Sequence, residues 1–587
     1  MPFEPGCAHA ERCPGCPLIQ LPYADGLAAK AARLARAFGR YPELEQSGLA
    51  SVVVGAESVT DYRTRAKLVS DGEGRLGLFA AGSHDVVDNP ECRVLSPKLA
   101  EVARALRALL PLEIPLRGVD LRLCDRGVLV SLVVLGRPEP SALGRVQARV
   151  LQALPHVVGL AVNIAQPGSV QLLGPELEVL HGTGAERHHL TLGAPWHYAS
   201  HGAFTQVHAG QTARLHQRIE GSCAERLGGL SGRRVLELYA GSGALALRLA
   251  ARGARVTAVE AFEPAVARLR GAAQAQALDV EAWVSDAEAF LALSGQQPGA
   301  EAAFDAVLVN PPRRGLAPGV RAALSRLAPK LLLYVSCEPE TLARDLSHFA
   351  LLGLGTEQVA GFDMIPLSDA VEGLARLEPR TPPAPRVLFE DATCVALYKL
   401  PFEATTPAGG SDVSLLDRAR RGLALSELTP VQRLEVGTSG VCWFARRPEH
   451  VAPLAQALER GATTYLGLAR GITHKKGKIA RRLREGATLT RYRRTSVLGG
   501  HSLLELEPEP GSKPQLRGHL GSIGHPIIGD ARHGQALTHR HFEHRHGLDR
   551  LFLHCASSRL TLASGPVEVQ AALAGDLAAV LASLQAG

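Results

Sequence analysis

The chain has 587 residues, which is too long for one hydrophobic core and predicts about three or four domains. Its 46% hydrophobic and 21% charged residues are ordinary for a globular protein, and the absence of any long apolar run predicts no membrane span. The formal charge of +7 permits a nucleic-acid partner, whereas 4% aromatic residues argue against a platform of many stacked rings. The first residues, MPFEPGCAHAERC, lack a signal-peptide core, so we expect a cytoplasmic protein with reduced cysteines.

Three cysteines near the start of the chain have the spacing C-x5-C-x2-C. They are Cys7, Cys13 and Cys16, and the CPGC segment forms a tight turn that can bring two thiolates onto one metal centre. Cys92, in DNPECRVLSP, is the candidate for a fourth ligand. Four thiolates suit either zinc or an iron–sulfur cluster, and the spacing alone does not choose between them. Cysteines without any metal are the alternative.

The segment RRVLELYAGSGALALRLAARG predicts a strand, a glycine turn and a helix. Gly241 and Gly243 would let a ligand approach the backbone closely. The next predicted strand, RVTAVE, ends in Glu260, whose carboxylate can accept hydrogen bonds from ribose hydroxyls. A third predicted strand, in VEAWVSDAEAF, is followed by Asp286, which suits a place near an adenine. Ala246 takes the place of the third glycine of a dinucleotide fingerprint, so the pattern favours S-adenosylmethionine. A simple βαβ packing turn is the alternative.

Cys337 lies in the run YVSCEPETLARDL. Upstream of it, VNPPRRGL ends an apolar run in a proline-rich loop, and downstream lies the lone acid Glu372. These three features predict a nucleophile, a substrate-holding loop and a base, as required for attack on a pyrimidine ring. For Cys337 taken alone, a buried structural thiol is the alternative.

Seven motifs occur in the order found in bacterial RNA uracil-C5 methyltransferases, and the resemblance covers roughly residues 5–380. They are YRTRAKLVSDGEGRLGLFAAGSHDVVDNPEC, GLAVNIAQPGSVQLLG, GAFTQVHAGQ, LYAGSGALAL, VLVNPPRRGL, YVSCEPETLARDL and FDMIPLSDAVEGLARL. The resemblance implies a class I methyltransferase fold with a mostly parallel central sheet, a 4Fe-4S cluster at the four cysteines, and an RNA substrate, with ribosomal RNA favoured and transfer RNA as the alternative. It also implies that Cys337 adds to uracil C6 and that Glu372 removes the C5 proton.

The resemblance further assigns residues to the two ligands. The cofactor set is Gln206, Tyr239, Gly241, Gly243, Glu260, Asp286 and Asn310, and the target-base set is Arg313 and Phe204, with Gln206 and Asn310 also able to face the base. Four positions depart from the family pattern, namely Glu237, His208, Glu338 and Ala370, which stand for Asp, Asn, Asn and His. Glu338 adds a negative charge beside Cys337, which disfavours the thiolate.

A second module follows the proline-rich residues 377–386. Its segments VQRLEVGTSGVCWFARRPEH and PGSKPQLRGHLGSIGHPIIGD resemble the large-subunit class of pseudouridine synthases, over roughly residues 386–580. That family's catalytic Asp is here Glu435, with Tyr465 and Arg517 as its partners. A displacement of about 1 Å can cost about a hundredfold in rate, so we favour a degenerate domain that binds RNA. An active synthase with Glu435 is the alternative.

Two charged segments are weaker signals. The basic residues 475–494 fit contacts with RNA phosphates or simply a solvated surface. The run THRHFEHRH holds four histidines that would suit a metal ion or a solvated loop, namely His539, His541, His544 and His546.

We therefore expect five regions: a cluster-binding region with a small β segment at 1–100, an α+β domain at 101–195, a catalytic domain at 196–378, a linker at 379–386, and a mixed-sheet domain at 387–587. The predicted function is methylation of uridine C5 in RNA by a monomer without a membrane partner. A methyltransferase that also isomerises uridine, and a non-catalytic RNA-binding or ribosome-assembly factor, are the alternatives.

Overall fold

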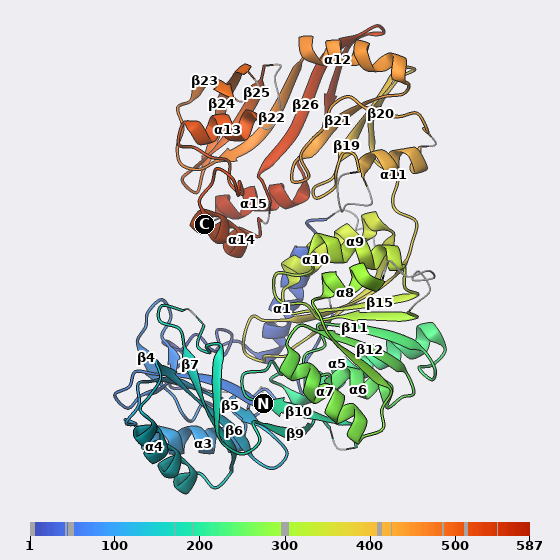
Figure 1. Cartoon of the computed structure of the whole chain (residues 1–587). Helices are drawn as coiled ribbons and strands as arrows, with labels where there is room; N and C mark the ends of the chain where they lie inside the picture. Colours follow the sequence, from blue (N-terminus) through green and yellow to red (C-terminus); the bar gives the residue numbers. More distant parts are fainter. Residues whose placement is uncertain are drawn as a thin grey trace. The chain divides into compact units, whose positions relative to one another are not determined.

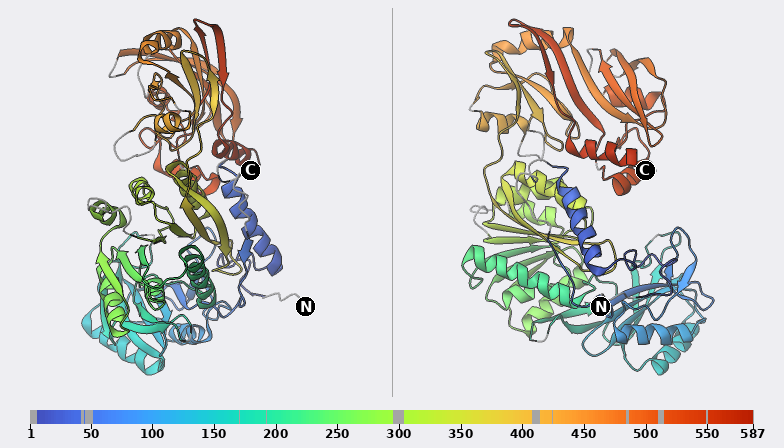
Figure 2. Two further views of the ribbon diagram at one scale, coloured as in Figure 1. Left: turned by 90° about the vertical axis from the view of Figure 1, so that its right-hand side faces the viewer. Right: turned by 180° about the vertical axis from the view of Figure 1, so that it is seen from behind.

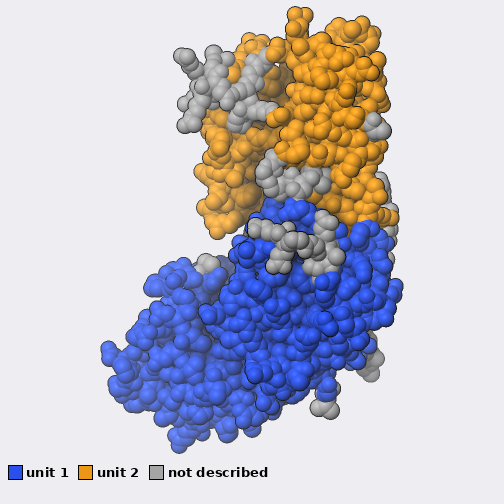
Figure 3. Space-filling model, turned by 45° about the vertical axis from the view of Figure 1, so that its right-hand side comes forward, with its two compact units in different colours: residues 1–37, 49–342, 356–379 blue, residues 38–48, 343–355, 380–587 orange. Residues whose placement is uncertain are grey.

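The computed structural model describes residues 6–41, 44, 52–169, 171–191, 193–294, 304–407, 414–423, 425–483, 486–509, 515–548 and 550–586. The chain forms two compact units (Figure 3). The first holds residues 1–37, 49–342 and 356–379, and the second holds residues 38–48, 343–355 and 380–587. Among the described helices none is both long and apolar enough to cross a membrane.

A seven-stranded sheet opens the first unit, in the order β4-β3-β2-β5-β6-β7-β8. Its strands are β2 (Arg65–Ser70), β3 (Leu76–Phe79), β4 (Val86–Asp88), β5 (Leu116–Leu123), β6 (Val128–Leu135), β7 (Val157–Ala165) and β8 (Glu176–His181). Helices α3 (Pro97–Ala108) and α4 (Pro140–Ala153) share a hydrophobic core with it. Because β2 pairs with β5, this sheet continues across residue 100, where one domain boundary is predicted.

The second sheet of this unit is eight-stranded, in the order β1-β16-β17-β15-β14-β11-β12-β13. Its strands are β1 (Val52–Val54), β11 (Arg234–Leu238), β12 (Arg255–Glu260), β13 (Val280–Val284), β14 (Ala306–Val309), β15 (Leu331–Ser336), β16 (Leu354–Phe362) and β17 (Glu372–Pro379). The pairs β13-β12-β11-β14-β15 are parallel, and β17 runs antiparallel to β15. Fully buried runs such as β14 and β15 are typical of a parallel sheet covered on both faces.

Helices cover both faces of this sheet (Figure 1). α5 (Ala209–Leu227), α6 (Ala244–Ala250) and α7 (Glu263–Ala275) lie on one face, and α8 (Ala287–Ser294), α9 (Pro318–Leu327) and α10 (Pro339–Leu352) lie on the other. The predicted strand, glycine turn and helix are therefore confirmed as β11 and α6, and the predicted mostly parallel sheet is confirmed as well.

The N-terminal region does not form a domain of its own. Strand β1 pairs in parallel with β16, and helix α1 (Tyr23–Phe38) binds the same sheet through Lys30, whose ammonium contacts Asp363 at 2.5 Å. The hydroxyl of Tyr23 also donates to Asp363, at 2.7 Å. The hairpin of β9 (Ala185–His189) and β10 (Trp196–Ser200) likewise crosses the boundary predicted at residue 195.

The second unit is built on a ten-stranded mixed sheet (Figure 2), as predicted for this module. Its strands are β18 (Val387–Glu390), β19 (Cys394–Lys399), β20 (Thr429–Pro430), β21 (Ser439–Ala445), β22 (Ala462–Ala469), β23 (Lys476–Leu483), β24 (Gly486–Leu498), β25 (His501–Pro508), β26 (Leu553–Leu562) and β27 (Gly565–Gln570). Its helices are α11 (Leu415–Gly422), α12 (Val451–Arg460), α13 (Gln515–Ser522), α14 (Ala536–His546) and α15 (Gly575–Ala586). Of the strand pairs described in this second unit, only β21 and β26 are parallel, and residues 380–386 before β18 have no helix or strand.

Candidate active site

The register of the sheet brings Cys337 and Glu372 together. Cys337 directly follows β15, and Ser336 at the end of that strand pairs with Gly373 of the antiparallel strand β17. Glu372 is therefore held beside the thiol at the edge of the sheet where the parallel strands end. The loop after the adjacent strand β14 reaches the same edge and supplies Arg313.

The thiol of Cys337 is surrounded by opposing charges. Burial raises its pKa, and the carboxylates of Glu372 and Glu338 raise it further. The guanidinium of Arg313 hydrogen-bonds the thiol and lowers its pKa. Arg313 is thus placed to stabilise the thiolate, which is the reactive form of cysteine.

Glu372 has the environment of a general base that works near neutral pH. Its carboxyl is buried, with 6% of the residue exposed, and burial raises its pKa to about 7. A hydrogen bond with the side chain of Gln206 and the charge of Arg313 both lower that pKa. A pKa near the working pH is the value that favours proton abstraction.

Glu338 does not face the thiol as an isolated charge. Its carboxylate pairs with Arg33 of α1, which also contacts Glu340 at 2.9 Å. Burial and a hydrogen bond with Glu340 raise the pKa of Glu338 to about 7, and Arg33 lowers it. The sequence comparison had no signal for Arg33, because its position depends on how α1 packs.

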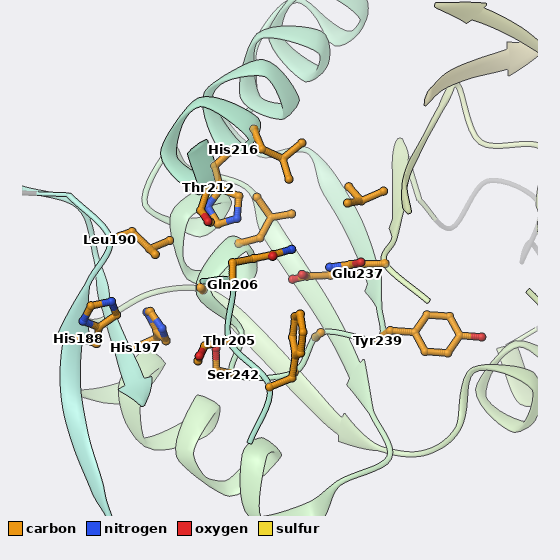
Figure 4. Close-up of a pocket in the computed structure, with 18 of the residues that line it drawn as sticks. His188, Leu190, His197, Thr205, Gln206, Thr212, His216, Glu237, Tyr239 and Ser242 are labelled. Carbon is orange, nitrogen blue, oxygen red and sulfur yellow. The ribbon is translucent and has the colours of Figure 1, made fainter. Parts of the chain in front are cut away.

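A pocket of about 100 Å³ lies next to this constellation. Five of the predicted ligand-binding residues line it, namely Phe204, Gln206, Tyr239, Gly241 and Asn310. Gln206 and Glu237 lie at its centre, and the ring of Tyr239 extends away from them (Figure 4). Tyr239 and Gly241 have φ values of 62° and 56°, so the turn after β11 uses left-handed backbone.

Three residues predicted to bind the cofactor do not line this pocket. A Cβ on Gly243 would lie 2.2 Å from Leu269, so close packing with α7 already requires glycine there. Glu260 accepts hydrogen bonds from the backbone of Gly241 at 3.0 Å and of Phe262 at 2.9 Å. Asp286 is exposed and accepts from the backbone of Ala289 at 2.9 Å, in the first turn of α8.

Several polar residues in the wall of the pocket were not assigned to the cofactor from the sequence. Four of them are Arg122, His197, His216 and Glu237. Burial raises the pKa of Glu237 to about 8, and burial lowers the pKa of His197 and of His216 to about 3. Of these four residues, only Glu237 was singled out from the sequence, because it differs from the aspartate of the family pattern.

The four N-terminal cysteines line a second, smaller pocket. They are Cys7, Cys13, Cys16 and Cys92. Burial, followed by the charges of Cys92 and Cys13, raises the pKa of Cys16 to about 12. Within the described part of the chain no group of three or more His, Cys, Asp or Glu side chains is arranged to hold a metal ion.

In the second unit the predicted pair of Glu435 and Arg517 is present. Arg517 Nη1 donates to Glu435 Oε2 at 2.8 Å, and its Nε and Nη2 donate to Asp530 at 3.0 and 2.6 Å. The third predicted partner, Tyr465, instead contacts Gln432, 3.4 Å from its hydroxyl. Residues 511–514 of the GSKPQLR segment lie outside the described residues.

The two weaker charged segments fold as a hairpin and a helix. Residues 475–494 lie largely on β23 and β24, and the histidine run lies on α14, where the rings of His541 and His546 are 5.5 Å apart. His546 Nδ1 contacts the hydroxyl of Ser583 at 2.9 Å. The side chain of His544 lies outside the described residues.

Comparisons with known proteins identify the family. A family model described as tRNA (Uracil-5-)-methyltransferase matches residues 196–378. The 23S rRNA (uracil(1939)-C(5))-methyltransferase RlmD of Pseudomonas aeruginosa is 32% identical over 380 residues, which cover 63% of this chain and 80% of the relative. This chain belongs to the RNA (uracil-5-)-methyltransferase family.

Two further similarities concern an uncharacterised relative and a solved structure. The uncharacterized RNA methyltransferase tlr0942 of Thermosynechococcus vestitus is 31% identical over 391 residues, covering 64% of this chain and 84% of the relative. The crystal structure of the Pyrococcus abyssi tRNA (uracil-54, C5)-methyltransferase with S-adenosyl-L-homocysteine is 23% identical, with a TM-score of 0.49, and covers 62% of this chain and 85% of that one.

Proposed function

We propose that this protein transfers a methyl group from S-adenosylmethionine to C5 of a uridine in RNA, with ribosomal RNA as the substrate class. The observation that carries the proposal is the grouping of Cys337, Arg313 and Glu372 at one edge of the sheet, next to the pocket formed by the glycine turn. Family membership and a relative named for a 23S rRNA uracil support the choice of substrate.

The arrangement suits a covalent route. The thiolate of Cys337 adds to C6 of uracil, and the ring becomes nucleophilic at C5. C5 then takes the methyl group from the sulfonium of the donor. Glu372, as a carboxylate, removes the C5 proton, and the thiolate of Cys337 leaves as the C5–C6 double bond re-forms. The target uridine must be flipped out of its stack to reach these groups.

The test is transfer of label from labelled S-adenosylmethionine to uracil C5 in ribosomal RNA. We expect Cys337→Ala to abolish transfer while S-adenosylhomocysteine still binds. Cys223→Ala is the matched control, because Cys223 is buried in α5 and burial raises its pKa to about 12, so it should keep its activity. A Cys337→Ala variant that still methylates would refute the covalent route.

We also propose that Cys7, Cys13, Cys16 and Cys92 hold a 4Fe-4S cluster, with zinc as the alternative. Four thiols that line one pocket have the donor chemistry of either site. Because methyl transfer moves no electrons, the group would serve to hold this region together. Anaerobically purified protein should contain iron and acid-labile sulfide and absorb visible light; zinc without sulfide would select the alternative.

For the second unit we propose RNA binding by a domain that resembles pseudouridine synthases. Glu435 replaces the family's aspartate, and its carboxylate is already engaged by Arg517. The same pair is also what an active synthase with a longer acid would require, so isomerisation of a second uridine is the competing function.

A further inference from the structure

Arg122 is a buried guanidinium whose donors are mostly unused. It lies on β5 with 2% of the residue exposed, and its Nε donates to Asp120 at 3.0 Å. Its Nη1 and Nη2 are buried and have no hydrogen-bond partner among the described residues. Leaving buried charged donors unsatisfied costs more than an ordinary hydrogen bond contributes, so this position favours a ligand that accepts from them.

The charges around Arg122 favour an anion. Asp120 is the carboxylate paired with Arg122, and it also contacts Arg65 at 3.2 Å. One carboxylate therefore faces two guanidinium groups, which leaves a net positive charge in a buried place. A planar guanidinium with free Nη groups suits a carboxylate, which it can bind through two parallel hydrogen bonds.

Arg122 lines the same pocket as the glycine turn, and so does an unused acceptor. Glu237 Oε2 is buried and has no partner within the described part of the chain, and Glu237 lies at the end of β11. Burial keeps His197 and His216, in the same wall, neutral at physiological pH, so their rings can donate or accept without repelling a cation or an anion. One pocket thus offers an unused cationic donor and an unused acidic acceptor.

A ligand that satisfies both must carry an anion and a cation, as the zwitterionic end of an α-amino acid does. We propose that Arg122 binds the α-carboxylate, and Glu237 the α-ammonium, of the methionine portion of S-adenosylmethionine. This assignment rests on the proposed function, because it deepens the account of the same pocket. A phosphate of RNA is disfavoured, because RNA binds at the surface of a protein and Arg122 is buried.

The experiment compares two ligands that differ only at this end. S-adenosylhomocysteine carries the amino-acid group, whereas 5′-methylthioadenosine keeps the adenosine and the thioether but lacks that group. Titration calorimetry with wild type should show that S-adenosylhomocysteine binds more tightly. Arg122→Met should weaken S-adenosylhomocysteine by roughly tenfold to a hundredfold, as expected for a hydrogen bond to a charged group, and leave 5′-methylthioadenosine unchanged.

The matched control is Arg107→Met, which removes a guanidinium paired with Asp88 and does not line the pocket. It should change neither affinity. Glu237→Gln is the second variant. It should reduce the difference in affinity between the two ligands, and this test does not depend on whether Arg122→Met folds. Circular dichroism melts monitor folding of all three.

The outcomes separate this inference from the proposed function. Failure of wild type to bind either ligand would count against the methyltransferase function itself. Binding of both ligands with equal affinity, or equal losses of both in Arg122→Met and Glu237→Gln, would overturn the assignment and leave the function standing. Weakened binding of ribosomal RNA in Arg122→Met, with an unchanged preference between the two ligands, would assign Arg122 to a phosphate instead.

Discussion

Arg33, on helix α1, pairs with Glu338, the residue directly after the candidate nucleophile Cys337. The pairing joins the N-terminal helix to the candidate active site, more than 300 positions away in the sequence. The positive charge of Arg33 also offsets the negative charge of Glu338, which would otherwise disfavour the thiolate of Cys337.

The first prediction concerns the thiolate. Glu338→Gln removes a charge that raises the pKa of Cys337, so the thiolate should form at lower pH. Arg33→Gln leaves Glu338 without its cation, so the thiolate should form at higher pH. Each shift should be roughly half a unit to one unit, because the groups are partly exposed. The rate of alkylation of Cys337 by iodoacetamide between pH 6 and 10 measures this.

Two other charges face the thiol and stay in place in both variants, namely Arg313 and Glu372. The double variant Arg33→Gln/Glu338→Gln serves as the control and should return towards wild type. If all four proteins alkylate with the same midpoint, the pair has no influence on the nucleophile.

The second prediction concerns the base. The pKa of Glu372 is about 7, so its carboxylate form, and with it the rate, should rise as the pH passes through 7. Gln206→Leu removes a hydrogen bond that lowers this pKa, so the rise should move to higher pH by about one unit. The pH dependence of kcat in the methylation of RNA measures the shift.

Glu372→Gln supplies the control for this prediction, since it removes the titrating group and should abolish the pH-dependent step. If Gln206→Leu lowers the rate but leaves the pH dependence of kcat unchanged, Gln206 acts in ligand binding alone.

How far the sequence predicted this site can be judged from particular residues. Cys337, Arg313 and Glu372 belong to compact motifs, and the ends of neighbouring strands bring such motifs together at one edge of a sheet. Arg33 and Arg122 belong to no motif. Their positions depend on how α1 packs and on the register of β5, and local sequence does not encode long-range packing.

The pairing of the N-terminal strand could not be predicted for a similar reason. Strand β1 has three residues, Val52–Val54, and becomes part of a sheet only by pairing with residues 360–362. The hydrophobic pattern of so short a segment does not indicate which strand it pairs with. The N-terminal region could therefore not be assigned to the eight-stranded sheet from the sequence.

The third prediction tests the attachment of α1. Lys30 and Asp363 are 2% and 0% exposed as side chains, so removal of one partner leaves a buried, uncompensated charge. Lys30→Met should lower the free energy of unfolding by about 3–5 kcal/mol, whereas Lys30→Met/Asp363→Leu should recover part of the loss. Urea unfolding measures both. Arg104→Gln, which breaks an exposed pair with Glu91 at 3.7 Å, should cost less than about 1 kcal/mol.

The fourth prediction separates free from paired cations on the hairpin of the second unit. Lys476 and Lys478 are exposed and have no ion pair among the described residues, whereas Arg491 and Arg493 pair with Glu509 and Glu505. Changing both lysines to Gln should weaken RNA binding and reduce the dependence of log K on log salt by about 1.4 to 1.8.

Changing both arginines to Gln is the matched control for those two lysines, because their charge is already offset, and it should have the smaller effect. Equal effects of the two pairs would show that the hairpin contributes only its overall charge.

The last prediction decides between the two functions of the second unit. If the unit only binds RNA, ribosomal RNA treated with wild type should give no carbodiimide-dependent stops in primer extension. Glu435→Ala should then bind RNA as well as wild type does, apart from the effect of leaving Arg517 paired with Asp530 alone. Stops that appear with wild type and vanish in Glu435→Ala would instead establish an active synthase.

Glu435→Asp is a further variant that tests the length of the acidic side chain, because the shorter carboxylate matches the acid of the related family. If only this variant gives stops, the extra methylene of Glu435 makes the wild-type site inactive, because a displacement of about 1 Å can lower the rate about a hundredfold.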